Sequence, residues 1–323
     1  TTARTIETAT QEGRFFNRVA PNYPMVALAM GHLCEGASTV AELSEDQAAA
    51  QTHRSQAYQW LHTARRLDRL DGDLAVKLLG YTPSSDIAQG AAMLRDTLRA
   101  GPVTNGWARA LRNLTEQETF LAAIQSMTDV ARTDAQSNNP VLWLQNGTPE
   151  TLRLGANVAA IRGHYHDAIE LSGLTAELYA KLGGRLDMAH AAVLGEQANY
   201  LFSAAPDRAS LAIATARAAL AALGDPGPRS AVAPALRSDL IQYLLADNQL
   251  DNAAEQAAIL AESYPPGLRP TAQALRSRHW AGLIGRFVAT DKATRPAGFE
   301  GWLKQATADG PMSLELLGVL ADM

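Results

Sequence analysis

The stretch RGHYHDAIEL, residues 162–171, decides how this chain is expected to fold. Gly163 is followed by an aromatic residue two positions later and by Ala168 five positions later. Glycine allows the chain to turn tightly, and alanine allows two helices to cross closely. Apolar residues continue at helical spacing through positions 171, 174, 178 and 182. We therefore interpret the stretch as the turn between two helices.

A metal site is the alternative interpretation of the same stretch, because it contains His164 and His166 with Asp167 and Glu170 close behind. Such a site needs three or four converging ligands, and nothing in this spacing fixes a tetrahedron. We expect both histidines to point outward on either side of a buried Tyr165. The sequence thus predicts no metal and no other cofactor.

Two further segments resemble this turn. Residues 248–253, Asn-Gln-Leu-Asp-Asn-Ala, repeat it with Asn in place of Gly and Leu in place of Tyr, and residues 204–209 give a degraded copy. The copies begin 41 and 44 residues apart, at positions 163, 204 and 248. Spacings of about 20–50 residues are typical of stacked structural repeats. The pattern predicts successive helix pairs.

Composition supports an all-α fold and excludes several classes of protein. Of the 323 residues, 47% are hydrophobic but only 6% aromatic, and no block alternates in the way that strands require. A net charge of −5 argues against a nucleic-acid-binding surface. No apolar run approaches the roughly 20 residues of a transmembrane segment. The single cysteine, Cys34, excludes an intramolecular disulfide, and we expect it to be a small buried hydrophobe.

Helix signals divide the chain into three regions. Residues 1–135 are expected to form an irregular helical N-terminal region. In this region Ser44 and Gln47 are predicted to form a capping box, and Thr115 is predicted to start another helix. The polar stretch 133–140 is the best internal boundary. Thr148 then reads as an N-cap, with Pro149 at the first helical position. Residues 148–265 carry the repeats, and residues 266–323 are expected to form C-terminal capping helices.

The repeat region resembles the tetratricopeptide repeat family, whose helix–turn–helix unit carries a Gly–x–Tyr–x–x–Ala segment across its turn. Residues 163–168 match that segment, and Leu194-Gly195 is similar to the Leu-Gly pair of the family's first helix. The units are longer than the usual repeat of about 34 residues. The resemblance implies an α-solenoid of elongated helix–turn–helix repeats over about residues 148–265.

The family's concave positions lie six and ten residues before the turn glycine. Carried onto this chain, these offsets give Asn157 and Arg153 in the first unit and Gln242 and Ser238 in the third, and Glu196 and Asn199 lie near the corresponding positions of the second. The resemblance implies that these six residues form a partner-binding surface.

These expectations favour a non-enzymatic interaction scaffold, an accessory subunit of a bacterial assembly that holds a protein or peptide in a concave helical groove. The alternative is a small-ligand sensor or solute-handling module with an enclosed pocket. No phosphate-binding loop, zinc-protease motif or nucleophile elbow occurs, so we expect no catalysis. The chain begins Thr1-Thr2-Ala3, and removal of a secretory leader would explain this start. We therefore expect a periplasmic or exported protein, with the cytoplasm as the alternative.

Overall fold

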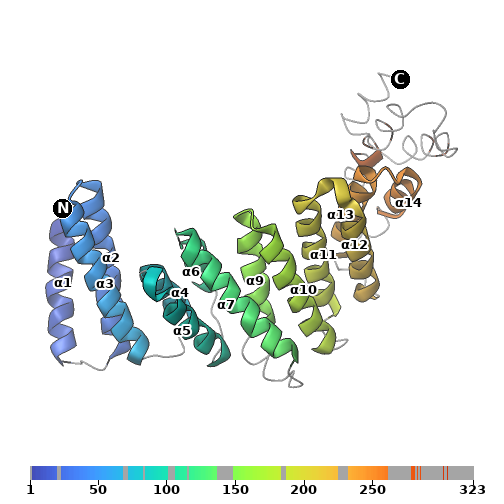
Figure 1. Ribbon diagram of the computed structural model, residues 1–323. Coiled ribbons are helices and arrows are strands. Elements are labelled where there is room, and N and C mark those ends of the chain that lie inside the picture. The colour runs from blue at the N-terminus through green and yellow to red at the C-terminus, as the bar shows by residue number, and fades with distance from the viewer. Residues whose placement is uncertain are drawn as a thin grey trace. The chain divides into compact units, whose positions relative to one another are not determined.

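The computed structural model describes most of the chain up to residue 260 and isolated residues beyond it (Figure 1). The described residues are 2–19, 23–67, 72–82, 84–100, 106–114, 116–136, 148–182, 187–224, 232–260, 278–280, 282, 284, 301 and 304. Every regular element among them is a helix, as composition predicted. The chain divides into two compact units, residues 1–158 and residues 159–323.

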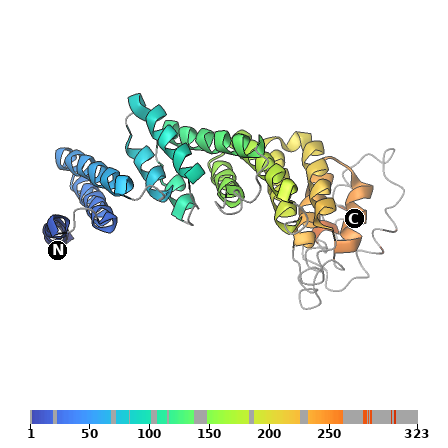
Figure 2. The same cartoon turned by 90° about the horizontal axis from the view of Figure 1, so that it is seen from below.

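Unit 1 is a succession of antiparallel helices that pack mainly on their neighbours (Figure 2). Helix α2 packs on both α1 and α3, and α4 packs on α3, α5, α6 and α7. The bounds are α1 Thr2–Val19, α2 Pro24–Leu43, α3 Gln47–Leu67, α4 Gly72–Tyr81, η1 Ser84–Asp86, α5 Ile87–Ala100, α6 Gly106–Arg112, α7 Gln117–Gln136 and α9 Thr148–Ile161.

Small and aliphatic side chains build the core of unit 1. Ala27, Leu61, Ala64, Leu74 and Leu78 form one buried cluster between α2, α3 and α4. On α7, Phe120, Ile124 and Met127 are all buried.

Helix α3 does not begin at the predicted capping box. Ser44 is the C-cap of α2, and its hydroxyl donates to the Val40 carbonyl. Asp46 caps α3 instead, because its Oδ1 accepts the Ala49 amide at 3.0 Å. The prediction was wrong because the three-residue connection leaves room for only one residue between the end of one helix and the cap of the next. The other predicted helix start, Thr115, lies outside the described residues.

Unit 2 is also a succession of helices, joined to α9 at its start. Helix α11 packs on α10 and α12, and α13 packs on α12, α14 and α11. Gly195 makes the contact of α11 with α13 close, because a side chain there would collide with Leu236. The bounds are α10 Tyr165–Leu182, α11 Asp187–Ala204, η2 Pro206–Arg208, α12 Ala209–Leu223, α13 Val232–Ala246 and α14 Leu250–Leu260.

The predicted turns at residues 163 and 248 share one backbone geometry. Gly163 has φ +80° and Asn248 has φ +56°, both left-handed. After Gly163, the amide of His164 donates to the Ala159 carbonyl at 2.9 Å, and after Asn248 the amide of Gln249 donates to the Leu244 carbonyl at 2.9 Å. These six-to-one hydrogen bonds define a Schellman motif, which satisfies carbonyls at the end of a helix.

A third turn of this type, which the sequence did not reveal, joins α2 to α3. Glu45 has φ +59°, and the amide of Asp46 donates to the Ala41 carbonyl at 3.0 Å. In each of these three turns a buried alanine, namely Ala50, Ala168 or Ala253, stands five residues after the left-handed residue. The degraded copy at residues 204–209 instead turns through the 3₁₀ helix η2, although its Ala209 is equally buried.

Tyr165 was expected to be buried, and this prediction is wrong. Tyr165 is only partly buried, whereas Leu250, the equivalent residue in the turn at Asn248, is buried. His166 is exposed, as expected, whereas His164 is partly buried. Tyr165 is the first residue of α10, next to the turn, and its side chain is covered only in part there.

Two predicted boundaries can be placed in the structure. Helix α7 continues to Gln136, so the first four residues of the polar stretch 133–140 are helical. Helix α9 begins at Thr148, one residue before Pro149. In the region expected to cap the repeats, the described residues 278–280, 282 and 284 are helical, and the buried Trp280 and Ile284 among them join the core of α12, α13 and α14.

Candidate functional site

The six residues predicted to face a partner lie on three alternate helices. Arg153 and Asn157 belong to α9 in unit 1, whereas the other four belong to unit 2, on α11 and α13, which contact each other. Within each pair one residue is exposed and the other is partly buried. The exposed members are Asn157, Asn199 and Gln242, and the partly buried members are Arg153, Glu196 and Ser238.

The three partly buried members all interact with other residues of the chain. Arg153 Nη1 lies 3.6 Å from Glu150 Oε2, one helical turn away. Ser238 Oγ lies 3.0 Å from Nε2 of His279, a residue that is only 6% exposed. Burial and, to a smaller extent, the charge of the neighbouring Arg278 together lower the pKa of His279 to about 4, so this imidazole is neutral at pH 7. Of the four predicted residues on α11 and α13, Asn199 and Gln242 are therefore the two that are exposed to solvent.

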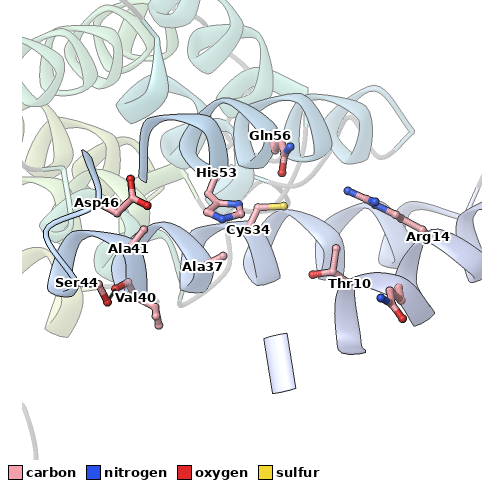
Figure 3. Close-up of a pocket in the computed structure, with 11 residues that line it drawn as sticks. Thr10, Arg14, Cys34, Ala37, Val40, Ala41, Ser44, Asp46, His53 and Gln56 are labelled. Carbon is pink, nitrogen blue, oxygen red and sulfur yellow. Dashed lines mark hydrogen bonds between the residues drawn. The ribbon is translucent and has the colours of Figure 1, made fainter. Parts of the chain in front are cut away.

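A pocket that the sequence did not predict lies in unit 1 between α1, α2 and α3 (Figure 3). Its volume is about 530 Å³. Helix α2 supplies an apolar wall, and the residues around this wall are polar. The apolar wall consists of Cys34, Ala37, Val40 and Ala41, and the polar lining consists of Thr10, Gln11, Arg14, Ser44, Asp46, His53 and Gln56.

A second hollow, of about 340 Å³, continues from this pocket along α3. Both hollows are lined by Thr10, Arg14, Cys34 and Gln56, and the second extends to Trp60 and Thr63. The place of α1 against α2 depends on Gly13, where a side chain would collide with Met30. No local motif signals the site, because it exists only once three helices are packed.

Cys34 is a thiol in this pocket and not an activated nucleophile. The residue is 4% exposed, and its sulfur lies on the pocket side of α2 in Figure 3. Burial raises the pKa of Cys34; the positive charge of Arg14 opposes this effect, and Glu35 adds to it. Since the thiolate is the reactive form, the arrangement does not favour covalent catalysis.

A separate polar cluster joins α2 to α4. The carboxylate of Glu35 accepts hydrogen bonds from Lys77 Nζ at 2.8 Å, Tyr81 Oη at 2.8 Å and His32 Nδ1 at 2.7 Å. Burial by itself would raise the pKa of Glu35, but these hydrogen bonds and the Lys77 charge outweigh it and lower the pKa to about 2. Glu35 is thus a fully ionised partner for Lys77 at neutral pH, which suits a structural link better than proton transfer.

The described residues supply no metal centre and no membrane-spanning helix. No group of three or more His, Cys, Asp or Glu side chains among them converges closely enough to hold an ion. In the turn of residues 162–171, His164 Nδ1 lies 3.8 Å from Asp167 Oδ2, and His166 is exposed. None of the described helices combines the length and the apolar character needed to cross a membrane.

No protein family model matches the chain, and the comparison with curated proteins gives no match.

Proposed function

We propose that this protein is a non-enzymatic interaction scaffold, an accessory subunit of a periplasmic bacterial assembly that binds a protein or peptide. In this proposal the helix pairs of unit 2 stack as elongated tetratricopeptide-like repeats. Their first helices, α11 and α13, then line a concave surface. Stacked helix pairs commonly use such a surface to bind extended partners.

The observation that carries the proposal is the recurrence of one turn at two predicted places. Gly163 and Asn248 adopt the same left-handed conformation, and each is followed by a buried alanine five residues later. The contact between α11 and α13 also supports it, because the first helices of successive repeats adjoin in such a stack. Asn199 and Gln242 are exposed on these two helices and are polar groups suited to a peptide backbone.

Site-specific photocrosslinking in cells tests this proposal. A photoreactive amino acid at Asn199 or Gln242 should capture one discrete protein. Matched controls are Arg217 and Glu255, which are exposed on the second helices α12 and α14. Equal capture at all four positions, or capture at the controls alone, would contradict a partner surface on α11 and α13.

The alternative, a small-ligand module, is favoured by a different observation, the pocket between α1, α2 and α3. A scaffold predicts that a partner protects residues of α11 and α13 from hydrogen exchange. A ligand module predicts that a small molecule protects α1, α2 and α3.

A further inference from the structure

The pocket in unit 1 brings together three side chains with hydrogen-bonding groups that are not otherwise used. Arg14 on α1 and His53 and Gln56 on α3 all line it. None of the three forms a hydrogen bond or an ion pair with another residue in the described part of the chain. They surround the apolar wall of α2, and an apolar wall with a few polar groups is typical of sites for small organic molecules.

Charge distinguishes the two ends of the pocket. Arg14 reaches toward Cys34 and Gln56 from α1, whereas Asp46 lies toward the opposite end of the α2 wall (Figure 3). One carboxylate oxygen of Asp46 is already used, since it caps α3 through the Ala49 amide at 3.0 Å. The guanidinium of Arg14 has no such partner among the described residues. The group of the pocket most available to a ligand is therefore cationic.

We propose that this pocket binds a small organic carboxylate with an unbranched apolar body. Arg14 pairs with the carboxylate, because a guanidinium presents two parallel N–H donors to the two oxygens. Gln56 adds a neutral amide beside Arg14, and the apolar body lies along Ala37 and Ala41. From Cys34 to Ala41 the helical rise of about 1.5 Å per residue gives a wall of roughly 10 Å. That length suits a medium-chain carboxylate, and the volume of about 530 Å³ lies in the usual range for ligand pockets.

Cys34 provides a direct measure of occupancy, because it is the single cysteine of the chain and lines the pocket. The full chain is treated with methyl methanethiolsulfonate, and the rate of its mass increase is measured with and without sodium octanoate. Octanol and octylamine, which carry the same chain with a neutral or a cationic head, are the matched probes. Octanoate should slow modification at least about fivefold, and the other two should have less than half of that effect. Equal protection by octanol would overturn the carboxylate assignment.

Two variants of α1 distinguish a direct contact between Arg14 and the carboxylate from a general attraction of the anion to positive charge. Arg14→Gln removes the proposed partner of the carboxylate, whereas Arg18→Gln removes an exposed arginine outside the pocket lining. By titration calorimetry, Arg14→Gln should weaken octanoate binding about tenfold or more, because hydrogen bonds to charged groups contribute at least that factor. Arg18→Gln should change it less than twofold. Helix content by circular dichroism verifies that both variants fold. Absence of octanoate binding to the unmodified protein, or an equal loss in the two variants, would refute the proposal.

Discussion

Lys77 Nζ lies 2.8 Å from Glu35 Oε2, and this ion pair joins α4 to α2, two helices that α3 separates in the chain. The Glu35 side chain is 23% exposed, so the pair is only partly screened by water. Such a pair stabilises the folded state only while Glu35 is ionised.

Unit 1 should therefore lose stability in acid. The pKa of Glu35 is about 2 in the folded chain and 4.5 ordinarily, so its contribution is complete above about pH 4.5 and is lost as the pH falls toward 2. The contribution amounts to at most about 3 kcal/mol. In urea unfolding at pH 7 and pH 3, Glu35→Gln should reduce stability at pH 7 and flatten the pH dependence. Glu42→Gln, which breaks the exposed pair with Arg54, should cost less than about 1 kcal/mol. Unchanged pH dependence in Glu35→Gln would contradict this role.

Unit 2 should lose stability at a higher pH through His279. The pKa of His279 is lowered by burial to about 4, so the unfolded chain takes up this proton first as the pH falls below about 6.5. The stability contributed by the neutral imidazole is then lost between about pH 6.5 and pH 4. His279→Gln retains a hydrogen-bonding group for Ser238 and should weaken the pH dependence of stability in this window, while His190, whose pKa is also lowered by burial, keeps its own contribution. Substitution of the exposed His166 with Gln should leave the pH dependence of stability unchanged. If stability changes equally with pH in the unmodified protein and in both variants, His279 is excluded as the cause.

Substitutions at the left-handed residues Glu45 and Gly163 should change stability in opposite directions. Glu45 holds a left-handed conformation that disfavours side chains, so Glu45→Gly should stabilise unit 1 by about 0.5–1 kcal/mol. Gly163→Ala should destabilise unit 2 by about 1–2 kcal/mol for the same reason. Thermal melting of the two variants checks both signs. Destabilisation by Glu45→Gly would show that the Glu45 side chain contributes more than the backbone conformation costs.

The buried alanines after the turns should tolerate no larger side chain. Ala168 and Ala253 are 0% and 1% exposed, so replacing either with Leu should overpack the helix crossing and cost about 1–3 kcal/mol. Ala50→Leu should behave alike, since this alanine is 4% exposed after the equivalent turn. Ala218→Leu on the exposed side of α12 is the matched control and should remain within about 0.5 kcal/mol. Melting temperatures equal to that of the control would contradict the crossing positions.

The stability of the turn formed by residues 162–171 should depend little on His164 and His166. Tyr165 is partly buried, so Tyr165→Ala should cost about 1–2 kcal/mol, less than the loss of a fully buried aromatic. His164→Ala and His166→Ala should each change stability by less than about 0.5 kcal/mol. A chelator should leave the melting temperature unchanged, because no metal would contribute its binding energy to folding. Larger losses in the histidine variants, together with a chelator effect, would restore the metal interpretation.

Local signals were sufficient to predict the helices and two of their turns. Gly163 and Asn248 belong to residue types that adopt left-handed backbone readily, and apolar periodicity surrounds them. Such features depend on a few neighbouring residues, so a linear sequence displays them. The turn at Glu45 escaped prediction because glutamate has no preference for that conformation, which the packing of α2 on α3 maintains.

Tertiary structure alone decided the pocket and the polar cluster around Glu35. Arg14, Cys34 and Gln56 lie on three different helices, and Glu35 meets Lys77 across 42 residues of sequence. These residues come together only where the helices approach closely. Small residues allow this approach, as Gly13 does where it faces Met30. Tyr165 illustrates the same limit, since its pattern predicted the turn correctly but not the depth of its burial. Periodicity reports which face of a helix is apolar, whereas the helix that covers that face is chosen by shape and volume over the whole unit.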